Sequence, residues 1–170
     1  MALMRTARSA SRRLLQPRAF ARGARRRRRL HGLAAFDPTI DIAHALTAPS
    51  DWYTREEYFE AEKATVFDTS WLHVGHAAQV AEPGDFFAGS VAGEPYVVVR
   101  GDDNIIRAFF NVCSHHAMAV AEGEGTVAKS RGARCLRCPY HGWEYLLDGR
   151  LRKATNVKGI KDFKNKNYGL

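Results

Sequence analysis

Two short stretches of this 170-residue chain carry side chains that bind transition metals. "CSH" places one residue between Cys113 and His115, and "CPYH" places two residues between Cys138 and His141. Thiolates and neutral imidazoles are ligands of zinc and of iron–sulfur clusters. A lone cysteine or histidine is usually only packed or solvated. Four of them in two paired, turn-flanked positions predict a metal centre built from two loops.

Two kinds of centre fit these residue types. One is structural zinc, with Cys135 and Cys138 as a CxxC pair. The other is a 2Fe–2S cluster in which two cysteines hold one iron and two histidines hold the other. The surroundings favour the cluster, because "CSH" after one predicted strand and "CPYHGW" after a second resemble the Rieske signature. The chain therefore resembles the N-terminal Rieske domain of the Rieske non-haem iron oxygenases.

The resemblance implies a role for each of the four side chains. Cys113 and Cys138 would hold the redox-silent iron, and His115 and His141 the iron that gains the electron. With only two thiolates the oxidised cluster carries no net charge, whereas four thiolates make it dianionic. Neutral imidazoles therefore raise the reduction potential above the roughly −400 mV of four-cysteine ferredoxins.

The resemblance also indicates a low-potential member of the family. High-potential Rieske proteins carry an extra cysteine in each loop, and Met118 and Tyr140 occupy those positions here. They also carry a serine where this chain has Trp143. Fewer hydrogen bonds to sulfur predict a potential near about −150 mV, which is typical of the oxygenases.

Within the family, "FFNVCSHHAMAVAEGEG" and "ATNVKGIKDFKNKNYGL" are most similar to choline monooxygenase-like proteins. That similarity implies that ferredoxin or a similar donor supplies electrons to the 2Fe–2S cluster. It also implies a mononuclear Fe(II) in a second, catalytic domain and the oxidation of choline to betaine aldehyde in glycine betaine biosynthesis. The full-length enzyme could form a homo-oligomer. No histidine follows His141, so we expect the mononuclear iron site only in a catalytic domain missing from this chain. Whether the chain alone is an enzyme stays open.

Three alternatives remain at this point. The chain could be a stand-alone Rieske-type ferredoxin, a Rieske oxygenase fragment that acts on another substrate, or a zinc-bound structural module.

The elements that must position the two loops are mainly short β-strands. Alternating apolar segments between turn signals predict strands at 71–76, 86–91, 95–100 and 105–110. "EPGD" at 82–85 and "GDDN" at 101–104 predict turns, and a further hairpin is expected around Asp148 and Gly149. Thr54 and Glu57 form a capping-box pattern that predicts one N-terminal helix ending near Phe67. The fold class predicted is a mainly β Rieske-type iron–sulfur domain of small antiparallel sheets with one N-terminal helix and two cluster-binding loops.

The charge is distributed unevenly along the chain. Residues 1–36 contain eleven arginines and no acidic residue, and the rest of the chain has a net charge of −3. The high content of basic residues therefore does not predict nucleic-acid binding, and no long apolar stretch predicts a membrane span. An Arg-rich, acid-free segment is typical of an organellar transit peptide, here for the mitochondrial matrix, with the chloroplast stroma as the alternative. We expect a linker at 37–51 and the C-terminally incomplete Rieske domain at 52–170.

A few further residues of metal-binding type are interpreted differently. Cys135 is expected to be a small residue at the end of a strand, and three cysteines are too few for a disulfide framework. His73 and His76 are interpreted as structural, and His116 as contacting solvent or the next domain. The 22 residues between His115 and Cys138 exceed the spacing usual in the family, and "GEGTVAKSRGAR" is expected to absorb the excess as a surface loop.

Overall fold

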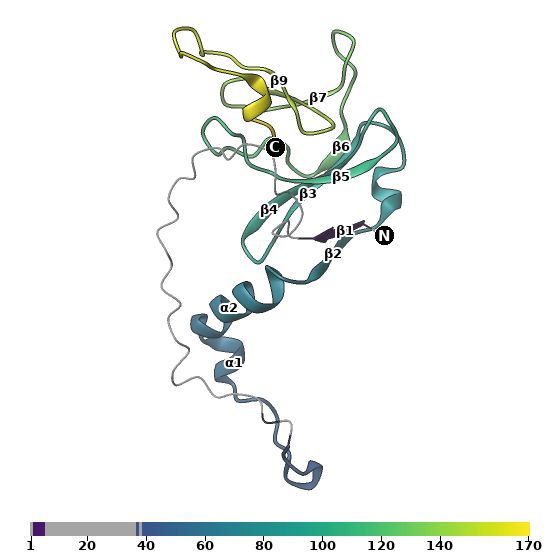
Figure 1. The fold of residues 1–170 in the computed structure, drawn as a ribbon. Coiled ribbons are helices and arrows are strands. Elements are labelled where there is room, and N and C mark those ends of the chain that lie inside the picture. Colours follow the sequence, from purple (N-terminus) through teal and green to yellow (C-terminus); the bar gives the residue numbers. More distant parts are fainter. Residues whose placement is uncertain (1, 6–36, 38) are drawn as a thin grey trace. The chain divides into compact units, whose positions relative to one another are not determined.

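The computed structural model describes residues 2–5, 37 and 39–170, so most of the predicted transit peptide at 1–36 lies outside the described residues. The described residues fall into two compact units, one ending at Trp71 and the other comprising residues 2–4 and 72–170. Figure 1 shows the order of the elements along the chain. Within the described part of the chain, no helix is long and apolar enough to cross a membrane.

The described part of the first unit is helical, as predicted, but residues 51–62 form two short α-helices rather than one. Its elements are a 3₁₀ turn, two α-helices and a π-helical turn: Ile42–His44, α1 (Asp51–Thr54), α2 (Glu56–Glu62) and Lys63–Phe67. Phe59 and Phe67 lie on the same face, with ring centroids 6.4 Å apart. The predicted end of the helical segment at Phe67 is confirmed.

The predicted capping box at Thr54 is wrong. Thr54 is the last residue of α1, and its hydroxyl donates back to the carbonyl of Ser50 at 3.2 Å. The N-cap of α2 is Arg55, whose extended backbone separates the two helices without a side-chain cap. Glu57 lies 3.5 Å from the Arg55 guanidinium. Because Thr54 is already inside a helical turn, its hydroxyl satisfies that turn instead of starting the next one.

The second unit is mainly β, which confirms the predicted fold class. Its strands are β1 (Ala2–Arg5), β2 (Trp71–Gly75), β3 (Asp85–Val91), β4 (Glu94–Arg100), β5 (Ile106–Phe110), β6 (Glu124–Thr126), β7 (Cys135–Arg137), β8 (Glu144–Leu146) and β9 (Leu151–Lys153). They form a two-stranded sheet β1-β2, a four-stranded sheet β5-β4-β3-β6 and a three-stranded sheet β7-β8-β9. The strands predicted at 71–76, 86–91, 95–100 and 105–110 are confirmed to within a residue at each end. Short 3₁₀ turns at Ala77–Val80 and Asn165–Asn167 complete the unit.

Strand β4 forms the centre of the four-stranded sheet, and both of its faces are covered. Val97, Val98 and Val99 are each fully buried. Successive side chains of a strand point to opposite faces, so Val97 and Val99 enter one apolar cluster and Val98 another. The cluster around Val97 and Val99 also contains Cys113 and Cys138. Strand β4 therefore belongs to the same apolar core as the cysteines of the two predicted metal-binding loops.

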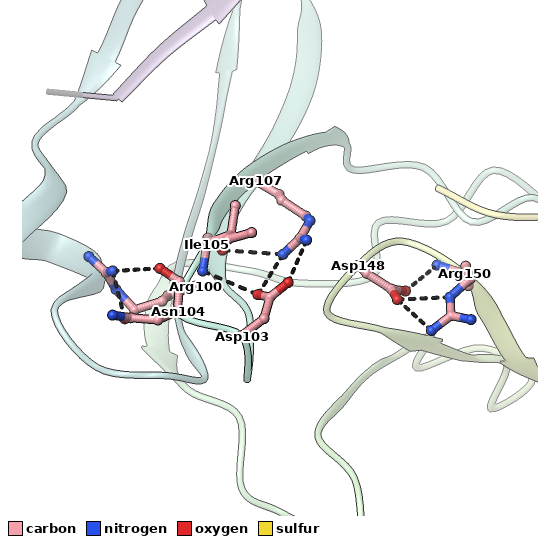
Figure 2. A network of polar contacts seen from close by, with 7 residues as sticks. All are labelled: Arg100, Asp103, Asn104, Ile105, Arg107, Asp148 and Arg150. Atoms are coloured by element: carbon pink, nitrogen blue, oxygen red, sulfur yellow. Dashed lines mark hydrogen bonds and ion pairs between the residues drawn. The ribbon is translucent and has the colours of Figure 1, made fainter.

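Polar contacts fix the turns at the ends of the hairpins, as Figure 2 shows. In the β4–β5 turn, Asp103 accepts hydrogen bonds from Arg107 at 2.6 and 2.8 Å and from the Ile105 amide at 3.1 Å. Hydrogen bonds from Arg107, and next from Ile105, lower the pKa of Asp103 to about 2. In the β8–β9 turn, Asp148 accepts from Arg150 Nε at 2.8 Å. The predicted turn at 101–104 and the hairpin around Asp148 and Gly149 are confirmed.

The β8–β9 turn also approaches the four-stranded sheet closely. Gly149 has φ +87°, and a Cβ there would lie 2.6 Å from Phe109 Cε1. Only glycine satisfies both conditions without strain. The carbonyl of Gly149 accepts a hydrogen bond from the amide of Leu170 at 2.8 Å. The last residues of the chain are therefore tied to this turn.

Candidate metal centre

The first loop leaves the end of β5 and is closed at its base by Asn111. This side chain is 5% exposed, and its Oδ1 accepts from the amides of Val120 at 2.9 Å and Ala121 at 3.1 Å. Its Nδ2 donates to the carbonyl of Ala121 at 2.7 Å. One buried amide therefore joins both ends of the loop, and sequence reasoning did not single it out. The only signal in the sequence is an amide residue directly after an apolar strand.

The two loops share one backbone arrangement around their cysteines. The carbonyl of Cys113 accepts from the amide of Ala117 at 2.9 Å, and the amide of Cys113 donates to the carbonyl of Met118 at 2.8 Å. The carbonyl of Cys138 accepts from the amide four residues later at 3.0 Å, and its amide donates to the carbonyl five residues later at 2.9 Å. The fourth residue has a positive φ in both loops, 57° at Ala117 and 69° at Gly142. Each cysteine is thus held at the start of an equivalent tight turn.

The structure places the two predicted cysteine ligands in one buried cluster and brings the two predicted histidine ligands close together. Cys113 and Cys138 are 2% and 3% exposed and belong to the same buried cluster. The rings of His115 and His141 lie 4.8 Å apart. Among the described residues, Nδ1 of both imidazoles is buried without a hydrogen-bond partner. Buried polar atoms are rarely left unpaired, and an imidazole nitrogen without a donor or acceptor partner is suited to bind a metal. Two buried thiols and two unpartnered imidazole nitrogens fit a 2Fe–2S cluster with mixed ligands.

His116 also lies beside this site, as the sequence did not predict. Its ring is 3.9 Å from that of His115, and the ligand nitrogens of His115, His116 and His141 all lie within 4.8 Å of one another. His116 is exposed, so its nitrogens are accessible to solvent. Because burial without a partner is found at His115 and His141 and not at His116, these two fit the role of ligand better.

The surroundings favour a neutral imidazole at His115. Burial, and then the nearby His116 and His141, lower the pKa of His115. A histidine must be neutral to bind a metal ion through the same nitrogen that a proton would occupy. The environment therefore prepares this side chain for coordination at neutral pH.

Tyr145 links β8 to the first loop, and the sequence analysis did not identify it. It is fully buried, and its hydroxyl lies 3.1 Å from Cys113 Sγ and accepts from the Ser114 amide at 3.0 Å. Burial, and next the hydrogen bond with Cys113, raise the pKa of Tyr145. The hydroxyl therefore keeps its proton and can donate it to a thiolate at Cys113. No sequence pattern joins residues that are 32 positions apart.

Aromatic rings pack around the second loop. Trp143 stacks on His115 with ring centroids 4.7 Å apart and an interplanar angle of 3°. Its indole Nε1 donates to the carbonyl of Thr155 at 3.2 Å, and the Thr155 hydroxyl donates to the carbonyl of His141. The stacking on Trp143 orients the imidazole of His115, and the hydrogen bond from Thr155 fixes the backbone of His141.

The last residues of the chain cover this arrangement. Phe163 and Tyr168 stack on each other at 4.6 Å and meet the edge or face of Trp143 at 5.8 and 6.1 Å. The hydroxyl of Ser114 donates to the carbonyl of Gly169 at 2.8 Å. We call residues 163–170 the C-terminal strap, since they contact both loops.

The remaining candidates lie away from the four predicted ligands. Cys135 begins β7 rather than ending a strand, and its Sγ accepts from Arg152 Nη1 at 3.4 Å. His76 caps the 3₁₀ turn at Ala77–Val80 through a hydrogen bond from the Ala78 amide, which confirms its structural role. His73 is exposed on β2, and its structural role stays a prediction.

Comparisons with known proteins place the chain in a family. A family model described as the Rieske [2Fe-2S] domain matches residues 70–164. The chain is 42% identical over 135 residues to a chloroplastic choline monooxygenase of Arabidopsis thaliana, covering 79% of this chain and 31% of that protein. It is 39% identical over 119 residues to the carnitine monooxygenase oxygenase subunit of Escherichia coli (strain K12), covering 70% of this chain and 30% of that protein.

A solved structure shares the fold. The quaternary ammonium Rieske monooxygenase CntA in complex with L-carnitine matches with a TM-score of 0.63 and 38% identity, over 71% of this chain and 33% of that chain. The chain thus spans about a third of the length of the relatives it matches.

Proposed function

This chain belongs to the Rieske [2Fe-2S] domain family, and we propose that it is the electron-accepting domain of a monooxygenase that acts on a quaternary ammonium compound. Cys113 and Cys138 would hold one iron through thiolates, and His115 and His141 the other through Nδ1. The observation that carries the proposal is the pair of buried imidazole nitrogens without partners, beside two buried cysteines.

A cluster of this type supplies a reversible one-electron centre. The residues of the chain would adjust that centre and shield it. With Cys113 as a thiolate, the Tyr145 hydroxyl, 3.1 Å away, would donate to Sγ and stabilise negative charge on that sulfur. Trp143 and the C-terminal strap keep water from one side of the imidazoles. The exposed ring of His116 marks the side on which a partner could approach His115 and His141.

The names of the relatives support the substrate class. The plant relatives are choline monooxygenases, and the bacterial relatives are carnitine monooxygenase oxygenase subunits. Choline and carnitine both carry a quaternary ammonium group, so we propose a substrate of this class, with choline oxidation to betaine aldehyde as the leading candidate. The substrate and a mononuclear Fe(II) would be bound by an oxygenase domain outside these 170 residues, and the electrons would come from a ferredoxin-type donor.

The proposed location is an organelle. Residues 1–36 would serve as the transit peptide, 37–51 as a linker and 52–170 as the Rieske domain. No finding supports the mitochondrial matrix that the arginine-rich composition favoured. Several plant relatives are described as chloroplastic, which favours the chloroplast stroma.

Reconstitution tests the cluster assignment. The full chain, loaded with ferrous iron and sulfide without oxygen, should turn red-brown and bind about two irons and two sulfides. A colourless protein that binds zinc alone would contradict the proposal. His141→Cys should lower the reduction potential, because a thiolate adds negative charge to the cluster. Cys135→Ser is the matched control and should retain iron and potential. An unchanged potential in His141→Cys would remove His141 from the ligand set.

A further inference from the structure

A cavity of 210 Å³ lies on the outer face of the three-stranded sheet β7-β8-β9. The strands form its floor, and the segment 128–133 forms a wall. That wall belongs to "GEGTVAKSRGAR", the stretch by which this chain exceeds the spacing expected for its family. A water molecule occupies about 30 Å³ in the liquid, so the cavity has room for a small organic molecule. None of the four predicted cluster ligands lines it.

The lining carries a strong excess of positive charge. Arg131, Arg137, Arg152 and Lys153 line the cavity together with a single carboxylate, Glu144. The strand register places Glu144 opposite both Arg137 and Lys153, so the three side chains share one face. In the part of the chain that the structure describes, the ion pairs found leave Arg131, Arg137 and Lys153 without a partner.

One of these cations also holds the wall in place. Arg152 donates from Nη2 to the carbonyl of Arg131 at 3.0 Å and from Nη1 to Cys135 Sγ at 3.4 Å. The guanidinium therefore bridges the floor and the wall. This leaves Arg131, Arg137 and Lys153, all exposed, as the cations that can turn toward a bound molecule.

The charge of the surrounding segment strengthens the effect. Residues 128–170 carry eleven lysines and arginines against three acidic residues, whereas residues 37–127 carry four against fifteen. A concave site lined by one sign of charge concentrates ions of the opposite sign. Guanidinium groups pair with carboxylates and phosphates through two parallel hydrogen bonds. The chemistry of the cavity is therefore that of an anion site.

Arg137 connects the cavity to the second predicted cluster loop. Its side chain packs over Gly142, where a Cβ would lie 3.2 Å from Nη2 and 3.4 Å from Nε. Gly142 follows His141 directly, and Arg137 precedes Cys138 directly. The Arg137 guanidinium thus lies both at the cavity and beside the second loop. An anion that pairs with this guanidinium changes the electrostatic potential at the loop.

We propose that this cavity binds a small anion with several carboxylate or phosphate groups, and that occupancy lowers the reduction potential of the cluster through Arg137. The first part is independent of the cluster, and the second rests on the proposed function. An anion paired with Arg137 offsets its positive charge. The added electron is then stabilised less, so the potential falls.

Calorimetry on the cluster-loaded full chain tests the binding. Citrate represents the carboxylates, and phosphate and pyrophosphate represent the phosphates, each titrated at constant ionic strength. At least one should bind saturably, with one molecule per chain, and the stronger arm identifies the class. Arg131→Gln and Lys153→Gln should each weaken binding about tenfold. Lys161→Gln is the matched control, an exposed lysine of the same basic segment outside the cavity. An equal loss in the control, or no saturable binding in any arm, would overturn the site.

Cys135 offers a second readout of occupancy. It lines the cavity, and it is the one cysteine of three not assigned to the cluster. Citrate or the better-bound phosphate should slow its alkylation by iodoacetamide in the loaded protein, and Lys153→Gln should weaken that protection. Alkylation at the same rate with a saturating anion would place the anion elsewhere.

Spectroelectrochemistry tests the link to the cluster. A saturating anion should lower the potential of the wild-type chain and leave that of Arg137→Gln unchanged. If the anion binds but the reduction potential does not change, the proposed role of Arg137 is refuted, while the anion site itself still stands. A chain that binds the anion but takes up no iron and sulfide would contradict the proposed function alone.

Discussion

Replacing Tyr145 by phenylalanine removes one hydroxyl from the buried surroundings of the proposed cluster. That hydroxyl lies 3.1 Å from Cys113 Sγ and accepts from the Ser114 amide at 3.0 Å. A hydrogen bond to a charged group contributes about 1.5–3 kcal/mol, and a buried amide left unpaired costs about 1–3 kcal/mol. Tyr145→Phe should therefore retain the fold with a free energy of unfolding lowered by about 1–3 kcal/mol.

The reduction potential should fall as well, because the bond is stronger when the cluster carries the extra electron. If about half of that hydrogen-bond free energy differs between the two redox states, the difference is about 0.75–1.5 kcal/mol. A one-electron couple shifts by about 59 mV for each tenfold change in equilibrium constant, so the expected fall is roughly 30–65 mV.

Redox titration followed by visible absorbance measures this shift. Tyr168→Phe is the matched control, since it removes a hydroxyl from a ring that packs on Trp143, and no hydrogen bond joins that hydroxyl to Cys113 among the described residues. Its potential should stay within about 10 mV of the wild type. A cluster-loaded Tyr145→Phe protein with an unchanged potential would refute the reasoning. Either the hydroxyl would not donate to Cys113, or Cys113 would not be a ligand.

Three further perturbations test the supporting structure. Asn111→Leu should lower the free energy of unfolding by about 3 kcal/mol or more, because two amides and a carbonyl lose their partner; urea unfolding measures it, and a loss below about 1 kcal/mol would refute the closing role of this amide. Gly142→Ala should reduce cluster uptake in reconstitution. Gly123→Ala is the control, because Gly123 has a similar φ of +63° and open space around it, and it should lose only about 1 kcal/mol of stability. Equal cluster content in the two variants would show that the tight turn at Gly142 is not needed for cluster binding. Hydrogen bonds from Arg107 lower the pKa of Asp103 to about 2, so Asp103 contributes stability that is present above about pH 4 and is lost as the pH falls toward 2. Asp103→Asn should therefore reduce the pH dependence of the melting temperature between about pH 4 and pH 2. An unchanged pH dependence would show that other carboxyl groups cause it.

Strands β2 to β5 and the β8–β9 hairpin could be predicted because each has a local signal. Strands β1 and β6 were not predicted, and β6 lies in the stretch expected to be a surface loop. Apolar alternation and turn residues lie within a few positions of one another, and the register of β3 with β4 follows once the turn between them is placed. The helix cap was mispredicted because a capping-box pattern does not reveal whether the threonine already belongs to an earlier turn. In this chain Asp51–Thr54 forms that turn.

The candidate site could be predicted only in part, for a related reason. Its four predicted ligands stand in two short motifs, and the structure brings those motifs together. Tyr145, Asn111 and the C-terminal strap act through contacts that span the chain, and neither their residue types nor their spacing marks them. The assignment of the four ligands stays a prediction that reconstitution decides.

The C-terminal strap has a consequence for the order in which the protein matures. Ser114 and Gly169 are 55 positions apart in sequence, and their hydrogen bond ties the first loop to nearly the last residue described. Contacts of such long separation form late, because the chain between them must be ordered first. The predicted cluster loops would thus stay uncovered until residues 163–170 dock. Iron and sulfide are then expected to enter before this segment docks, and docking would cover the assembled cluster.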